Sequence, residues 1–141
     1  MEGRKIKLLV IDDEVDIRES LERILERYGY SVLTAQDGEE GLKIISEQDI
    51  DIVLCDISMP KMDGIEFLRN IRKVTLKTEV IIITGQSTID RCVEAIEQNA
   101  CGYLLKPLKT EDILHNIRRA EKRVEEKKKM MEQAFIDKQK K

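Results

Sequence analysis

The chain has 141 residues, which is enough for one domain with a buried core and too few for two. Apolar residues make up 41% and charged residues 38%, a composition that excludes a disordered or fibrous protein. The net charge of −3 argues against a general nucleic-acid surface, and no apolar run is long enough to span a bilayer.

The cysteines and the N-terminus both indicate a cytoplasmic protein. Cys55, Cys92 and Cys101 are odd in number and lack the spacing of metal ligands, so we expect buried free thiols in a reducing compartment. The first residues contain no apolar stretch of the signal-peptide type. We therefore expect neither a nucleic acid nor a membrane as a direct partner of this chain.

Five short apolar runs predict five β-strands. Each run is apolar almost throughout, which is typical of strands that are covered on both faces of a sheet. The predicted strands cover residues 6–11, 31–35, 50–55, 79–83 and 102–105.

A helical period follows each predicted strand, because apolar residues then recur at spacings of three and four. Gly29 suits the left-handed position after the first helix, and Asp37 and Thr110 suit the N-caps of the second and the last. The predicted helices cover residues 15–28, 38–46, 64–71 and 89–96, and the last begins at 110.

This alternation of strands and helices, without a hairpin signal, predicts an α/β fold. The expected architecture is a doubly wound parallel sheet with helices on both faces and right-handed crossovers. In such sheets, ligands bind beyond the carboxyl ends of the strands.

Polar residues follow four of the predicted strands at this edge. Asp12 and Asp13 end the first strand, Asp56 the third, Thr84 the fourth and Lys106 the fifth. Singly, each has a simpler interpretation, such as a turn former for Asp56 or a strand-end hydroxyl for Thr84. Because the carboxyl ends of parallel strands meet at one edge, we expect all five side chains to lie close together.

Three carboxylates in one cleft require positive charge beside them. At about 5 Å and an effective dielectric near 20, each pair repels by about 3 kcal/mol. Lys106 supplies one positive charge, and the oxygen ligands suit Mg²⁺ better than Ca²⁺ as the source of the rest. A metal, an ammonium and a hydroxyl around Asp56 could neutralise a transferring phosphoryl group, with Asp56 as the nucleophile.

The chain resembles the receiver domain of two-component response regulators over roughly Lys5 to Glu121. The resemblance is carried by four motifs: Asp12-Asp13, Asp56-x-x-Met59-Pro60-x-x-Asp63-Gly64, Thr84-Gly85 and Lys106-Pro107. It implies a flavodoxin-like, CheY-like three-layer sandwich with strand order 2-1-3-4-5. It also implies a phosphoacceptor domain over residues 1–121, with 122–141 as an extension of the last helix.

The resemblance further implies the roles of the site residues. Asp56 would accept a phosphoryl group from the phosphohistidine of a sensor histidine kinase. Asp12 and Asp13 would hold Mg²⁺ together with Asp56 and the backbone carbonyl of Ser58. Lys106 would pair with Asp56 before the reaction and with a phosphoryl oxygen after it. The chain would then be a signalling switch that catalyses its own phosphorylation and dephosphorylation, and not an enzyme with a separate substrate.

Thr84 and Tyr103 are the residues that the resemblance implies as the switch. Thr84 would turn toward the phosphoryl group and let Tyr103 move inward, although Tyr103 could instead be a static core aromatic. The Lys106–Pro107 peptide bond would be cis. Ser58 and Gln86 would border the phosphoryl site.

The last predicted helix is longer than a minimal domain needs. One interpretation is a solvated helix that frays after about Arg123; the other is a short parallel coiled coil that joins two receivers into a homodimer. Helical linkers of this kind also precede the output domains of transcription activators, but the sequence does not identify an output partner. The seam positions are Ile113, Ile117, Ala120, Val124, Met131 and Ala134, with Lys127 at one core position.

Two other functions use the same residues. The first is a Mg²⁺-dependent aspartyl-phosphate phosphatase, but such enzymes often need an acid–base Asp two residues after the nucleophile, where this chain has Ser58. The second is a receiver-like scaffold that never accepts phosphate. The sequence indicates neither the cognate kinase nor the lifetime of an aspartyl-phosphate.

Overall fold

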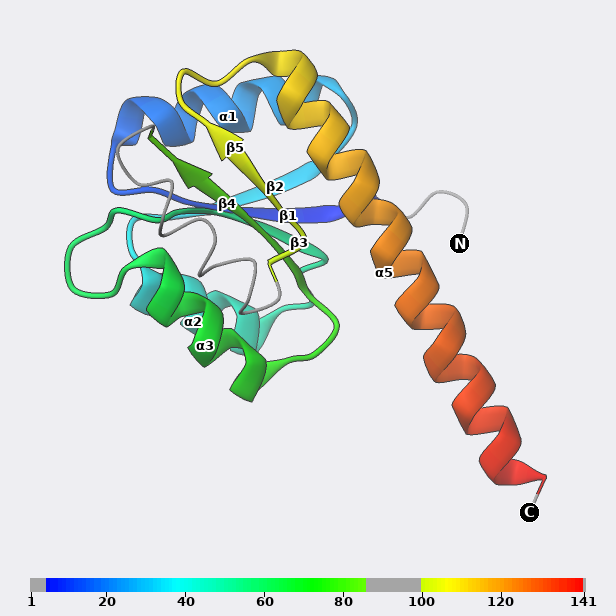
Figure 1. Ribbon diagram of the computed structural model, residues 1–141. Helices are drawn as coiled ribbons and strands as arrows, with labels where there is room; N and C mark the ends of the chain where they lie inside the picture. The colour runs from blue at the N-terminus through cyan, green and yellow to red at the C-terminus, as the bar shows by residue number, and fades with distance from the viewer. Residues whose placement is uncertain (1–4, 86–99, 141) are drawn as a thin grey trace.

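The sheet of this protein is parallel and has five strands. The computed structural model describes residues 5–85 and 100–140, so the predicted helix over 89–96 lies outside the described residues. The strand order β2-β1-β3-β4-β5 confirms the predicted doubly wound topology (Figure 1). The strands are β1 (Lys7–Ile11), β2 (Ser31–Ala35), β3 (Ile52–Asp56), β4 (Glu79–Thr84) and β5 (Gly102–Leu105).

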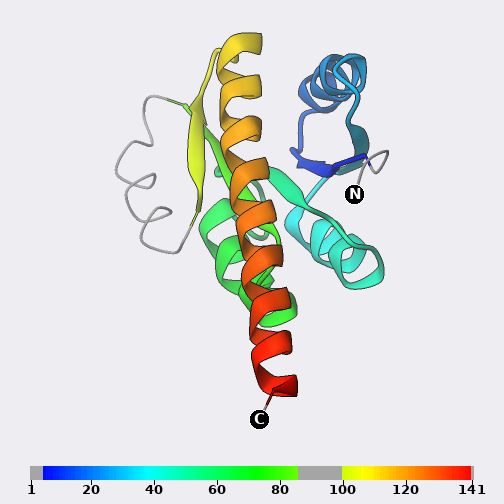
Figure 2. The ribbon, with the colours of Figure 1, turned by 90° about the vertical axis from the view of Figure 1, so that its right-hand side faces the viewer.

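The described helices cover both faces of the sheet (Figures 1 and 2). Helices α1 (Val15–Arg27) and α5 (Thr110–Gln139) pack on one face. Helices α2 (Gly38–Glu47) and α3 (Gly64–Val74) pack on the other. None of the helices in the described ranges is both long enough and apolar enough to cross a membrane.

The two apolar cores follow from the alternation of side chains along each strand. In β1, Leu8 and Val10 face α1 and α5, whereas Leu9 and Ile11 face α2 and α3. All four side chains are fully buried. Because both faces of β1 are covered, its four residues from Leu8 to Ile11 are all apolar and show no alternation of polar and apolar residues.

The cysteine prediction holds only in part. Cys55 and Cys101 are both free thiols, whereas Cys92 lies outside the described residues. Cys55 is fully buried in the sheet, but Cys101 is partly exposed. Burial nevertheless raises the pKa of Cys101 to about 11, so its thiol stays protonated near neutral pH.

Helix caps were predicted correctly at Gly29 and Asp37 but not at Thr110. Gly29 follows α1 with a positive φ of 91°, and the Asp37 side chain accepts a hydrogen bond of 2.9 Å from the Glu40 amide. Thr110 is instead the first residue of α5, and Lys109 is the N-cap with no side-chain hydrogen bond. Lys109 is the last residue with extended backbone, so the cap falls one position earlier than predicted.

The interpretation that the last helix frays after about Arg123 is wrong. Helix α5 is continuous to Gln139 and extends past the edge of the sheet (Figure 1). The first part of the predicted seam, from Ile113 to Val124, is buried against the sheet of the same chain. These side chains are therefore unavailable for a coiled coil.

Gly64 allows α3 to begin directly against the loop that follows β3. Its amide donates a 3.0 Å hydrogen bond to the Ile57 carbonyl. A Cβ atom at Gly64 would lie 2.8 Å from the Ile57 Cα and 3.1 Å from the Asp56 carbonyl oxygen. The contact is with backbone, so no side-chain rotation could relieve it.

We therefore expect Gly64→Ala to lower the free energy of unfolding by about 1–3 kcal/mol, measured by urea denaturation. The matched control is Gly38→Ala at the start of α2. A Cβ atom there would meet only the flexible Met62 side chain, with its sulfur at 2.8 Å. Equal losses in the two variants would contradict the backbone clash.

Candidate functional site

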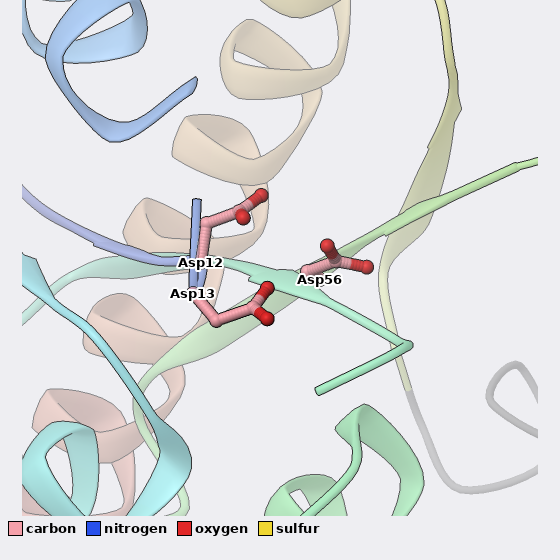
Figure 3. Close-up of side chains that lie close together, drawn as sticks. All are labelled: Asp12, Asp13 and Asp56. Atoms are coloured by element: carbon pink, nitrogen blue, oxygen red, sulfur yellow. The ribbon is translucent and has the colours of Figure 1, made fainter. Parts of the chain in front are cut away.

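Three carboxylates meet at the carboxyl edge of the sheet. Ile11 of β1 pairs with Cys55 of β3, so the residues that follow, Asp12 and Asp56, lie side by side. Oxygen atoms of Asp12, Asp13 and Asp56 lie within 4.8 Å of one another. Figure 3 shows these side chains projecting from the two neighbouring strand ends.

Asp12 carries the largest electrostatic cost of the three. Its side chain is fully buried, and Oδ1 accepts a 2.9 Å hydrogen bond from the Glu14 amide. Its Oδ2 is buried and has no hydrogen-bond partner among the described residues. Burial, with the nearby charge of Asp56 adding to it, raises the pKa of Asp12 from 3.8 to about 6.

Asp56 is the last residue of β3 and is only 3% exposed. Its Oδ2 accepts a hydrogen bond of 3.1 Å from the Lys106 ammonium, and its Oδ1 accepts one of 3.0 Å from the Ser58 amide. Burial alone would lower the pKa of Lys106, but the hydrogen bond to Asp56 and the surrounding carboxylates raise it. Lys106 therefore remains a cation beside the carboxylate group.

The loop after β3 keeps Asp56 in position with backbone and apolar contacts. Met59 is buried, and Lys61 adopts a positive φ of 69° that turns the chain toward α3. Asp63 caps α3, because its side chain accepts a 2.9 Å hydrogen bond from the Glu66 amide. The loop therefore connects Asp56 directly to the start of α3.

Thr84 and Lys106 belong to the same edge. Thr84 is fully buried at the end of β4, and its hydroxyl donates a 3.1 Å hydrogen bond to the Gly85 carbonyl. The Lys106 amide donates a 2.8 Å hydrogen bond to the Thr84 carbonyl, and the Lys106–Pro107 peptide bond is cis. The structure thus brings together Asp12, Asp13, Asp56, Thr84 and Lys106, whereas Gln86 lies outside the described residues.

Tyr103 does not lie in the core. It is on β5, opposite Ile82 of β4, and it is 45% exposed. The interpretation as a static core aromatic is therefore wrong. The neighbouring residue Leu104 is 2% exposed and packs in the core formed with α1 and α5, so Tyr103 projects from the opposite face of the sheet.

A second group of charges, at the opposite edge of the sheet, was missed from the sequence. Glu79 begins β4 with no exposure to solvent, and Arg123 and Lys127 of α5 contact it. The available signal was an acidic residue at the start of a predicted buried strand, together with two basic residues four apart on a helix.

The donor set at the carboxyl edge fits a divalent cation. The carboxylates offer oxygen ligands, and within the part of the chain that the structure describes the Asp12 Oδ2 has no hydrogen-bond donor, which a buried carboxylate oxygen needs. Hard oxygen donors with few protein ligands are those that Mg²⁺ prefers.

Comparison with known proteins agrees with this arrangement. The transcriptional regulatory protein ZraR of Klebsiella oxytoca is 40% identical over 108 residues, which are 77% of this chain and 24% of that protein. Response regulator MprA of Mycolicibacterium vanbaalenii is 36% identical over 113 residues, which are 80% of this chain and 49% of that protein. The chain therefore spans from about a quarter to a half of these relatives' length.

Comparisons with solved structures and with family models also find response regulators. The crystal structure of a response regulator receiver domain protein from Clostridium thermocellum has a TM-score of 0.80 and 38% identity, covering 89% of this chain and 98% of that one. A family model described as response regulator receiver domain matches residues 8–118. The chain therefore belongs to the response regulator receiver domain family.

Proposed function

We propose that this chain is a cytoplasmic signalling switch in which Asp56 accepts a phosphoryl group from the phosphohistidine of a sensor histidine kinase. One observation carries the proposal: a buried carboxylate held 3.1 Å from the Lys106 ammonium, inside a cluster of three carboxylates. Family membership supports the assignment, because receivers act as signalling switches.

The proposed chemistry is an attack by the Asp56 carboxylate on phosphorus. One carboxylate oxygen forms the new P–O bond as the P–N bond of the phosphohistidine breaks, and the imidazole leaves with the electron pair and takes up a proton. The contacts of Asp56 with Lys106 and the Ser58 amide limit its rotation, so its carboxylate is oriented before the reaction.

Lys106 and Thr84 would stabilise the phosphoryl oxygens. The Lys106 ammonium is already in the cleft and would exchange Asp56 for a phosphoryl oxygen, while the Thr84 hydroxyl would donate a hydrogen bond to another. Mg²⁺ held by Asp12, Asp13, Asp56 and the Ser58 carbonyl would supply the remaining neutralising charge. Hydrolysis of the aspartyl-phosphate in the same site would reset the switch.

We further propose Thr84 and Tyr103 as the switch pair. Thr84 pairs with Leu105 of β5, two residues beyond Tyr103 on the same strand. Movement of Thr84 toward the phosphoryl group would vacate space beside β5, and the exposed Tyr103 would turn into it. The surface of β5 and the start of α5 would then differ between the two states and select the downstream partner or output domain.

Homodimerisation is the second part of the proposal, and its supporting residues lie only in the outer part of α5. Met131 and Phe135 are one helical turn apart and are 45% and 64% exposed. Met130 and Ile136 flank them and are also exposed. A second copy of the same helix would cover this surface as a short coiled coil.

Acetyl phosphate with Mg²⁺ should add to the wild type one phosphoryl group that is labile to alkali and hydroxylamine, as an acyl phosphate is, because the site catalyses its own phosphorylation. Intact-mass spectrometry measures the adduct. Asp56→Asn should abolish it, whereas Asp49→Asn, an exposed carboxylate at the other edge of the sheet, should not. An unmodified wild type would favour a non-phosphorylated scaffold, and turnover of small phosphomonoesters would favour a phosphatase.

Asp12→Asn should stabilise the protein in Mg²⁺-free buffer, because ionisation of Asp12 costs the folded state stability as the pH rises from 3.8 to about 6. At about pH 7.5 we expect the free energy of unfolding to rise by about 1–3 kcal/mol. Below about pH 4, where Asp12 is protonated in both states, this gain should fall to about zero. Urea denaturation at several pH values checks this.

The control for this prediction is Asp13→Asn, which changes an exposed carboxylate of the same pair and should give a smaller gain. Added Mg²⁺ should stabilise the wild type more than Asp12→Asn, because the variant loses a ligand. A gain that is independent of pH would contradict the assignment of the cost to Asp12.

Phe135→Glu should convert a dimer to a monomer, because it places charge in the proposed apolar contact between two α5 helices. Light scattering coupled to size-exclusion chromatography measures the mass. Gln133→Glu adds the same charge two residues away, on the opposite side of the helix, and should leave the dimer intact. A monomeric wild type in both phosphorylation states would refute this part of the proposal.

A further inference from the structure

Helix α5 is attached to the domain by a buried charge as well as by apolar contacts. Glu79, the first residue of β4, has no exposure to solvent. Its Oε1 lies 2.9 Å from the Lys127 ammonium and 3.3 Å from Nε of Arg123. Arg123 and Lys127 are four residues apart and therefore project from the same side of α5.

Arg123 and Lys127 are the cations that pair with the buried Glu79 carboxylate among the described residues. Its Oε2 has no hydrogen-bond partner among the described residues. A third cation, Arg72 of α3, is nearby and donates a 2.8 Å hydrogen bond to the Thr78 carbonyl. A buried carboxylate is costly to leave unpaired, so movement of α5 away from β4 would be strongly opposed.

Lys127 also joins α5 to the loop between α3 and β4. Its ammonium donates a 3.0 Å hydrogen bond to the Leu76 carbonyl. Lys127 thus contacts two separate segments of the domain, and its side chain is only 30% exposed. A lysine on a solvated helix would instead extend into water.

The charged contacts lie where the apolar contacts of α5 end. Val124, 3% exposed, is the last buried residue of the helix, and residues 129–140 are all exposed. Beyond the sheet, α5 continues as an isolated helix (Figure 2). Arg123 and Lys127 therefore contact the domain from the last turn that touches it, and Lys128 adds a weaker contact there, 3.9 Å from the Asp51 carboxylate.

We propose that Glu79, Arg123 and Lys127 form a clamp that fixes the direction of α5 on β4 and makes residues 125–139 a rigid extension of the receiver. An isolated helix of this length is marginal in water, so a fixed first turn is needed to propagate it. Because β4 begins at Glu79 and ends at Thr84, the clamp attaches the helix to the strand that carries a residue of the phosphoacceptor edge.

Hydrogen exchange measured by mass spectrometry on the full chain tests the clamp. In the wild type, amide protection should continue past Lys127. Glu79→Gln removes the buried charge at constant size, and we expect amides in 125–139 to exchange about tenfold faster or more, while those in 113–120 keep their protection. Lys127→Gln should have the same regional effect.

Lys129→Gln is the matched control, because it removes the same charge from an exposed position on α5 and should leave exchange unchanged. The double variant Glu79→Gln with Lys127→Gln should lose less protection than the sum of the two single losses, because both single variants remove the same Glu79–Lys127 ion pair. Wild-type exchange of 125–139 in Glu79→Gln would overturn the proposal. The proposal would also be overturned if, in the wild type, the amides of residues 125–128 exchanged as fast as those of 133–139. This second test does not depend on the folding of any variant.

Discussion

The close approach of Asp12 and Asp56 on adjacent parallel strands is the constraint on which the site depends. Register places them side by side, and burial of Asp12 raises its pKa to about 6. Lys106 offsets part of the repulsion, but the Asp12 Oδ2 is left without a partner among the described residues. The described residues thus leave buried negative charge at this edge that a bound cation would offset, in agreement with the proposed function.

Backbone groups hold this cluster in place more than side chains do. The amides of Glu14 and Ser58 donate to the two carboxylates, and the Lys106 amide donates to the Thr84 carbonyl. Gly64 lets α3 begin directly against the loop after Asp56, where a Cβ atom would collide with the backbone. Because backbone positions are set by the sheet and helices, the site is oriented by the whole fold and needs few dedicated side chains.

The charged groups at the two edges of the sheet are balanced differently. At the carboxyl edge, carboxylates outnumber cations, so the site is suited to binding positive charge. At the amino edge, the buried Glu79 is matched by cations from α5 and its charge serves the attachment of that helix. Strand β4 begins with Glu79 at the amino edge and ends with Thr84 at the carboxyl edge, so one strand carries residues of both groups.

The sequence by itself determined the sheet topology and the membership of the carboxyl-edge site. Apolar runs bounded by Asp12, Asp56, Thr84 and Lys106 are sufficient for this, because parallel strands bring their ends to one edge whatever the details of packing. Tertiary structure decided which partner each side chain meets. The spacing from Ile113 to Val124 fits a coiled coil as well as a sheet face, and only the presence of the sheet selects the second. Likewise, the sequence places an acidic residue, Glu79, at the start of a predicted buried strand but does not identify its partners. Its pairing with Arg123 and Lys127 exists because α5 crosses the amino end of β4, a long-range contact that the tertiary structure decides.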